Sequence, residues 1–143
     1  MSNFNPNATS FDEGIQRIRS ALDEIGFQSK GEILTSRHDS MRKVEKLLAV
    51  DNVPDGFSKW QLPVFLDGPS QLYVSVGNPG VDVPEHSHDG GDGFRYIVSG
   101  SVIYEGVELV QGDWMFIPGG KKYRLKIGDR GALMCYCYCC SCA

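Results

Sequence analysis

The 143-residue chain carries 14 basic and 18 acidic side chains, a formal net charge of −4, and 41% hydrophobic residues. These values are ordinary for one globular domain, and the acidic balance argues against a nucleic-acid or anionic-membrane surface. The sequence holds no apolar run long enough to span a membrane, and its polar N-terminus lacks a basic head followed by an apolar core. We therefore expect a cytoplasmic location, with neither nucleic acid nor membrane as a partner.

The N-terminal part of the chain has helical periodicity. Ser10 and Glu13 have the spacing of a capping box, and the apolar stripe that follows predicts a helix over residues 11–25. A second stripe predicts another helix over residues 40–49. His38 precedes this helix, remote from the other histidines, and is expected to be a solvated loop residue.

From Trp60 onward the apolar pattern is that of strands punctuated by Gly and Pro. Residues 60–66 and 71–76 are predicted to form a hairpin, and further strands are predicted at 94–98, 102–105, 107–110, 114–117, 123–127 and 133–139. Short strands at this spacing predict an all-β sandwich or barrel. We expect an N-terminal extension with two helices at 1–58 and a β domain at 59–143.

Two histidines stand out in the β region. His86 and His88 are two residues apart, and residues at this spacing in a strand project to the same face. Two imidazoles side by side have the geometry that a metal ion needs from its first two ligands, and proteins complete such a site with a third or fourth ligand. The alternative is a pair of exposed or hydrogen-bonded strand histidines without metal.

This segment and a later one resemble the two sequence motifs of the cupin superfamily. The matching positions are Gly80, His86, His88 and Gly100 in the first motif, and Gly112, Pro118 and Gly120 in the second. The resemblance implies a cupin jelly-roll barrel with a cavity in its mouth, preceded here by a helical extension. Gly93 stands where the family has a glutamate ligand, and Tyr123 stands where it has a third histidine. Any metal site therefore needs a replacement ligand.

Three kinds of side chain could replace the missing ligands. Asp92 is one residue before the missing glutamate, in a glycine-rich loop flexible enough to alter strand parity. Tyr123 would act as a metal ligand or general base, or else as a cavity-lining aromatic that hydrogen-bonds a ligand. The thiolate candidates, which share one face of a predicted strand, are Cys135, Cys137 and Cys139.

All five cysteines fall in the last nine residues of the chain. Neighbours this close in an extended strand are poorly placed to bond one another, so we expect reduced thiols. They either join the two imidazoles, if their face lines the cavity, or bind soft metal ions on their own. The alternative is that they fill a barrel strand as small apolar side chains.

Two functions follow from these residues and the resemblance. The first is a metal-dependent cupin enzyme of the dioxygenase, lyase or isomerase type, acting on a small molecule. Its divalent transition metal (Fe, Zn, Mn, Ni or Cu) would be anchored by His86 and His88 and completed by Asp92, Tyr123 or a thiolate. The second is a non-enzymatic protein, either a ligand-binding cupin without a cofactor or a soft-metal thiolate protein. Histidines hydrogen-bonded to protein groups in an apolar cavity would favour the ligand-binding cupin. The resemblance also implies a homodimer.

Overall fold

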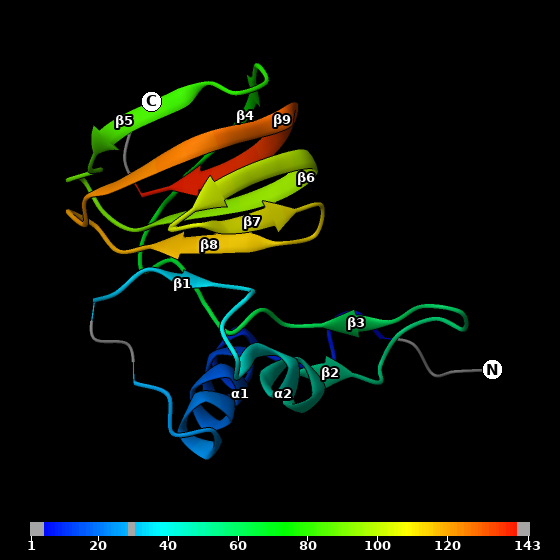
Figure 1. Ribbon diagram of the computed structural model, residues 1–143. Coiled ribbons are helices and arrows are strands. Elements are labelled where there is room, and N and C mark those ends of the chain that lie inside the picture. The colour runs from blue at the N-terminus through cyan, green and yellow to red at the C-terminus, as the bar shows by residue number, and fades with distance from the viewer. Residues whose placement is uncertain (1–4, 29–30, 140–143) are drawn as a thin grey trace. The chain divides into compact units, whose positions relative to one another are not determined.

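The structure is a computed structural model that describes residues 5–28 and 31–139. The chain divides into two compact units (Figure 1). The helical unit consists of residues 1–29 and 39–65, and the β unit consists of residues 30–38 and 66–143. The predicted all-β fold class with an N-terminal helical extension is confirmed. The domain boundary expected after residue 58 stays a prediction.

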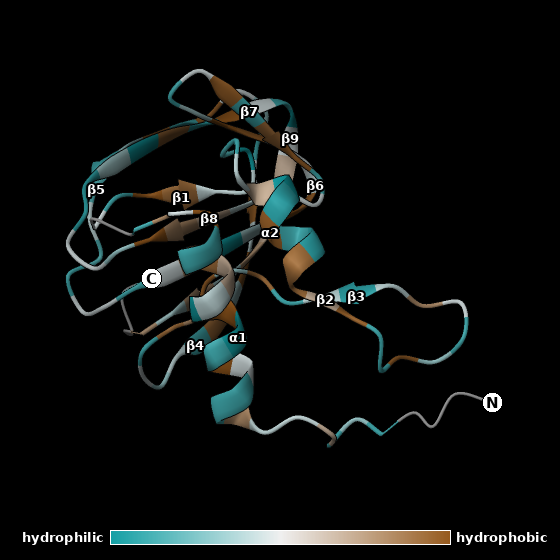
Figure 2. Cartoon of the chain, turned by 90° about the horizontal axis from the view of Figure 1, so that it is seen from below, coloured by the Kyte–Doolittle hydropathy of each residue, from teal (hydrophilic) through white to brown (hydrophobic). Residues whose placement is uncertain are grey.

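The helical unit contains α1 (Phe11–Glu24) and α2 (Met41–Leu47). The Ser10 hydroxyl accepts a hydrogen bond from the Glu13 backbone N–H, and the Glu13 carboxylate accepts one from the Ser10 N–H, which confirms the predicted capping box. Both helices carry hydrophilic and hydrophobic faces (Figure 2), and the buried residues of the unit include Ile18, Ala21, Met41, Val44 and Leu48. No helix within the described ranges is long and apolar enough to cross a membrane.

The hairpin predicted from residues 60–66 and 71–76 is wrong. Strand β3 (Lys59–Trp60) pairs instead with β2 (Ala49–Val50), and residues 61–70 form no strand. Pro63 lies in the middle of the predicted strand and has no backbone N–H to donate to a neighbouring strand. Of the two predicted strands only the second exists, as β4 (Gln71–Gly77).

The β unit is one antiparallel seven-stranded sheet built around two long strands, β6 (Gly93–Tyr104) and β9 (Tyr123–Tyr138). Strands β8 (Trp114–Ile117) and β7 (Val107–Val110) pair with β6, and β1 (Leu34–Thr35) pairs with β8. Strands β4 and β5 (Asp82–His86) pair with the two ends of β9. Figure 1 shows β6 and β9 side by side in the middle of this unit.

The sequence predicted two strands where the structure has β6 and two where it has β9. The predicted strands leave Gly100 and Gly131 in the gaps between them, but each lies within a continuous strand where the register of β6 with β9 is irregular, with φ of 71° and 74°. A Cβ atom on Gly100 would overlap the carbonyl of Gly131, so the two strands approach closely only because glycine stands there. The long strands are thereby able to carry residues of the core and of the cavity on one face.

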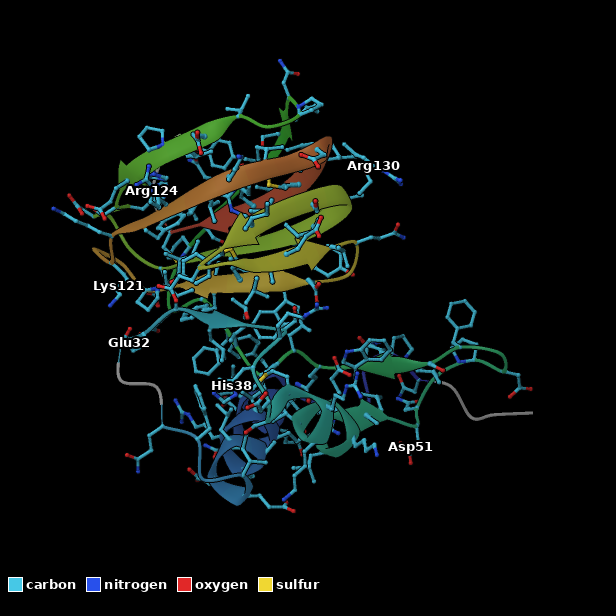
Figure 3. All side chains as sticks on the ribbon, in the orientation of Figure 1. Glu32, His38, Asp51, Lys121, Arg124 and Arg130 are labelled. Atoms are coloured by element: carbon cyan, nitrogen blue, oxygen red, sulfur yellow. The ribbon has the colours of Figure 1, made fainter. Side chains whose placement is uncertain are left out.

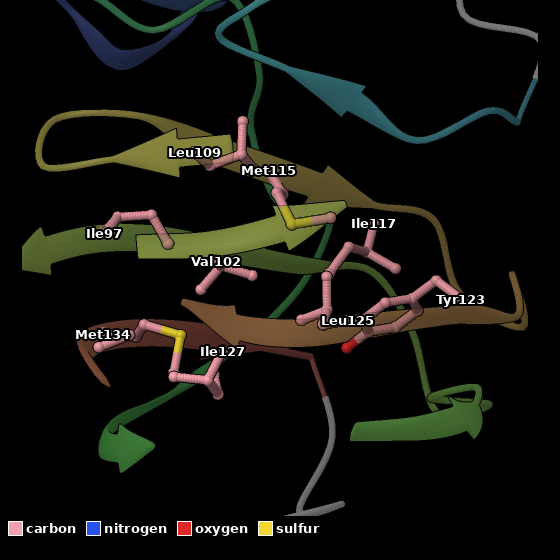
Figure 4. Close-up of a cluster of buried hydrophobic side chains, with 10 residues drawn as sticks. Ile97, Val102, Leu109, Met115, Ile117, Tyr123, Leu125, Ile127 and Met134 are labelled. Atoms are coloured by element: carbon pink, nitrogen blue, oxygen red, sulfur yellow. The ribbon is translucent and has the colours of Figure 1, made fainter. Parts of the chain in front are cut away.

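The core of the β unit is a cluster of buried side chains from strands β6 to β9 (Figure 4). Its members are Ile97, Val102, Leu109, Met115, Ile117, Tyr123, Leu125, Ile127, Ala132 and Met134. Tyr123 and Met134 belong to this core and also contact the polar residues of the cavity. The site is therefore held by side chains that the core fixes in place.

Candidate functional site

A cavity of about 440 Å³ lies in the β unit, between β4, β5, β6 and β9. Its polar lining residues are Tyr73, Ser75, His86, His88, Arg95, Tyr136 and Tyr138. Tyr136 lies directly opposite both Tyr73 on β4 and Arg95 on β6, and residues opposite one another in a sheet project to the same face. Strand parity therefore directs these side chains into one space.

Both predicted histidines line this cavity. His86 ends β5 opposite Tyr123, and its Nδ1–H donates to the Pro84 carbonyl at 2.8 Å. His88 follows the strand, with Nε2 3.2 Å from the Tyr123 hydroxyl and its ring stacked on Tyr138 at 4.2 Å. The two imidazole centroids are 5.1 Å apart. Each imidazole is thus hydrogen-bonded to a protein group.

Arg95 is the charged residue of the cavity, and its side chain is only 5% exposed. Its Nη1 donates to the Tyr136 hydroxyl at 2.5 Å and to the Met134 sulfur at 3.3 Å. Its Nη2 donates to the hydroxyls of Tyr138 at 3.2 Å and of Tyr123 at 3.3 Å. Nε is buried without a hydrogen-bond partner, and Cζ lies 3.9 Å from the centre of the Tyr136 ring. Every partner of this cation is a neutral group.

Within the described residues no carboxylate balances the positive charge of Arg95. Across the described residues the ion pairs are Arg37 with Asp113 and Lys121 with Glu32, the latter seen in Figure 3, and neither involves Arg95. Burial lowers the pKa of Arg95, but the surrounding phenols of Tyr138, Tyr136 and Tyr123 raise it, and the net pKa lies above its ordinary value. The guanidinium therefore stays charged, and removal of such a group from water costs several kcal/mol.

Tyr138 stays protonated beside this cation. Burial raises the pKa of Tyr138 far above its usual range, and Tyr123 and Tyr136 raise it further, whereas Arg95 lowers it. A phenol in this state is a hydrogen-bond donor at neutral pH. The cavity end formed by Arg95, Tyr136 and Tyr138 therefore presents one cation and neutral hydroxyl groups.

The structure does not bring Asp92 or the described thiols to the histidines. The Asp92 carboxylate accepts a hydrogen bond from the Gly119 N–H at 2.9 Å and lies outside the cavity lining. Cys135 and Cys137 lie on the face of β9 opposite to Tyr136 and Tyr138, because alternate strand residues face opposite ways. Cys139 is also absent from the cavity lining. The strand face that lines the cavity is the tyrosine face.

Two of the described thiols, Cys137 and Cys139, are shifted towards the protonated form. Cys135, Cys137 and Cys139 are free. Burial raises the pKa of Cys137 and of Cys139, and neighbouring thiols or carboxylates raise it further. From residue 5 to 28 and from 31 to 139, no three His, Cys, Asp or Glu side chains lie close enough together to hold a metal ion. Cys140 and Cys142 lie outside the described residues.

The place of the missing glutamate is filled. A Cβ atom on Gly93 would overlap the ring of Tyr138, which stacks on His88. The place of the missing histidine is held by Tyr123, whose hydroxyl lies between His88 Nε2 and Arg95 Nη2. A guanidinium one hydroxyl group away opposes a second cation. The residues that the structure describes around the histidines therefore do not fit a resident divalent metal ion. The catalytic role considered for Tyr123 stays a prediction.

Arg95, Tyr136 and Tyr138 were not identified as site residues from the sequence. Arg95 follows Gly93 by two residues, so strand parity alone would have directed it to the face of the missing glutamate. The two tyrosines alternate with the cysteines along β9. The cysteine face was considered as the cavity lining, whereas the tyrosine face lines the cavity. Exposed His38 takes no part in the cavity.

No family model and no curated protein matches the sequence. Among solved structures, the chain is similar to a protein of unknown function with a cupin-like fold from Ralstonia eutropha (20% identity, TM-score 0.43), covering 48% of this chain and 45% of that one. It is also similar to a cupin from Bacteroides fragilis (20%, TM-score 0.40), covering 78% and 77%, and to the Escherichia coli pirin YhhW in complex with nickel(II) (14%, TM-score 0.40), covering 49% and 31%.

The chain thus spans less than half the length of the Ralstonia structure and about a third of the pirin. Identities of 14–20% and TM-scores of 0.40–0.43 assign no activity, metal or partner to this chain.

Proposed function

We propose that this protein binds a small organic anion in the cavity of its β unit and acts as a ligand-binding module. The observation that carries the proposal is the buried guanidinium of Arg95, which has only neutral partners and an unpartnered Nε. A buried cation is stable when an anion and further hydrogen bonds compensate it. The protein supplies the hydrogen bonds here, and a ligand would supply the anion.

The surroundings of Arg95 support binding more than catalysis. His86 and His88 both use a ring nitrogen on a protein group, which is the arrangement expected of a ligand-binding cavity. A concave, largely apolar cavity with a few convergent polar groups is typical of small-molecule sites. Bonds between a charged donor and a carboxylate are about twice as strong as bonds between neutral groups, so Arg95 would dominate recognition.

The proposal is tested by thermal unfolding of the wild type and of Arg95→Met, with sodium acetate and with its neutral analogue acetamide at equal ionic strength. A ligand that binds only the folded state raises the unfolding temperature. We expect acetate to stabilise the wild type and not the variant, and acetamide to stabilise neither. Equal stabilisation of both proteins by acetate would contradict the proposal.

The metal-dependent enzyme predicted from the sequence would need a third His, Cys, Asp or Glu beside the two imidazoles, and the described residues place none there. Metal analysis of protein purified without chelator tests it, using the wild type, His86→Ala/His88→Ala and Cys135→Ser/Cys137→Ser/Cys139→Ser. Substitution is preferable to truncation, because β9 extends to Tyr138. Stoichiometric metal that is lost only in the histidine variant would overturn the metal-free proposal, and loss only in the cysteine variant would indicate a thiolate site.

A further inference from the structure

The cavity has a polar end and an apolar end, and the sheet register separates them. Along β9, Tyr138 and Tyr136 are followed by Met134, and Ile127 lies beyond the Gly131 bulge. A Cβ atom on Gly77 would lie 2.7 Å from the Ile127 side chain, which places Ile127 at the far end of β4 from Tyr73. The cavity lining therefore changes from polar side chains near Tyr138 to apolar side chains near Ile127.

Strand β5 and the segment before it follow the same gradient. The Ile127 N–H donates to the Val81 carbonyl at 2.8 Å, and Val83 lies opposite Leu125. His86, at the other end of β5, lies opposite Tyr123. The apolar end of the cavity is thus formed by Gly77, Val81, Val83 and Ile127, and the polar end by the histidines, Arg95 and the tyrosines.

Resting on the proposed anion binding, we infer that the ligand is a monocarboxylic acid with an apolar body. Its carboxylate lies at the Arg95 end, and its hydrocarbon part lies against Val81, Val83 and Ile127. The lining contains one permanent cation, which matches one negative charge. The apolar end offers aliphatic side chains, which match hydrocarbon and leave no polar atom of such a ligand unpaired.

Two other ligand classes fit this cavity less well. A phosphate group carries a higher charge and is usually held by several cations or by backbone N–H groups at a helix N-terminus. The lining of this cavity contains one arginine and comes from strands and the residues that flank β5, with no helix. A sugar carries hydroxyl groups on all sides, and those against Val81, Val83 and Ile127 would lose their hydrogen bonds. A monocarboxylate avoids both penalties.

The test is calorimetric titration of the protein with sodium acetate, butyrate and hexanoate, and with hexanamide and hexyl phosphate. Each buried methylene should raise the affinity roughly fourfold, since it contributes about 0.8 kcal/mol. We expect hexanoate to bind most tightly of these five ligands. Val83→Thr should weaken hexanoate several-fold and leave acetate unchanged, because the hydroxyl lies only at the apolar end.

Val110→Thr is the matched control, since Val110 is 42% exposed on β7 and outside the cavity. Arg95→Met should abolish binding of every acid. If that variant does not fold, the comparison of hexanoate with hexanamide on the wild type makes the same distinction.

The outcomes separate the two proposals. Acid binding that depends on Arg95 but does not increase with chain length would overturn the inference and leave the proposed function standing. Tighter binding of hexyl phosphate than of hexanoate would also overturn the inference, in favour of a phosphate ligand. Absence of acid binding, or equal binding of hexanamide and hexanoate, would overturn the proposed function itself.

Discussion

At the scale of single residues, Arg95 combines burial with the lack of an ion pair within the described chain. In the ligand-free protein this arrangement costs free energy, because the guanidinium has lost water and gained only neutral partners. We expect Arg95→Met to raise the free energy of unfolding of the ligand-free protein by about 1 kcal/mol or more. Urea denaturation measures this, with Tyr96→Phe on the opposite face as control. A loss of stability of similar size would show that the hydrogen bonds to the phenols outweigh the cost of burial.

Cys137 should react slowly with alkylating reagents at pH 8. Burial raises the pKa of its thiol, and Cys135 and Cys139 raise it further, so less of the reactive thiolate is present than in an ordinary cysteine. In a variant whose other cysteines are serine, the contributions of Cys135 and Cys139 are absent but burial still raises the pKa of Cys137, so the rate of iodoacetamide labelling should still be rising above pH 9. The same shift stabilises the folded state below the pKa of the unfolded thiol, and this contribution is lost as pH rises through the folded pKa. Labelling as fast as in urea would contradict the prediction.

Residue spacing predicted part of the site. The His-x-His spacing predicted that His86 and His88 project to the same face, and both line the cavity. It could not show that the Asp92 carboxylate bonds to the Gly119 N–H, 27 residues away. It also could not show that Tyr138 fills the space beside Gly93, because that contact depends on the register of β6 and β9.

At the scale of elements, the capping box fixes the start of α1. Ser10→Ala removes the acceptor of the Glu13 N–H and should destabilise the helical unit by about 1 kcal/mol. Separately, hydrogen bonds from the Ser10 backbone N–H and hydroxyl lower the pKa of Glu13, so the contribution of this carboxylate is present at neutral pH and is lost as pH falls through the lowered pKa. Circular dichroism melts between pH 7 and acidic pH measure both effects. Thr at position 10 is the control, and it should retain most of the stability.

Gly93 is required by the pairing of β6 with β9. Gly93→Ala would place a methyl group against the Tyr138 ring and should cost about 1–3 kcal/mol in the free energy of unfolding. The cost should shrink in a Tyr138→Ala background, because the ring that the methyl group meets is then absent. A double-mutant cycle measures this coupling. Independent, additive effects would show that Tyr138 is not the obstacle.

The elements that sequence predicted well are those defined by local signals. The helix at residues 11–25 has a cap, a stripe and a terminating glycine, and it was found nearly to its last residue. Gly100 and Gly131 have the same local signature as turn glycines, and only the pairing of two distant strands makes them bulges. The hairpin predicted from residues 60–66 and 71–76 was wrong for a related reason, since Trp60 pairs with Ala49, which precedes it in the chain, and not with a later strand.

At the scale of the whole molecule, β4 is the last strand of the sheet order and carries Leu72 and Val76 at 80% and 75% exposure. Exposed apolar edge strands readily pair with a second chain. The homodimer implied by the family resemblance would use this strand, and Leu72→Lys should shift the protein towards monomer in sedimentation velocity. Val107→Lys, at another exposed valine, is the control. An unchanged sedimentation coefficient for Leu72→Lys would exclude β4 as the contact.

The overall fold class was predictable because Gly and Pro punctuation and the motif spacing extend over the whole β unit. The assignment of residues 30–38 was not predictable. These residues lie between the two helices in sequence yet supply β1, whose two residues pair with Met115 and Phe116 of β8. A two-residue strand has too little periodicity to be recognised, and its partner lies about 80 residues away.

In strand β9 cysteine and tyrosine alternate from Cys135 to Tyr138, so the thiols lie on one face of the strand and the phenols on the other. Deletion of one residue between Gly131 and Cys135 would exchange the two sets. The sulfur atoms would then replace the hydroxyl groups around Arg95, and the phenols would move to the outer surface. The spacing of this segment is consequently as constrained as its composition, and related chains that keep the cavity should vary here by substitution and never by odd-numbered insertion or loss.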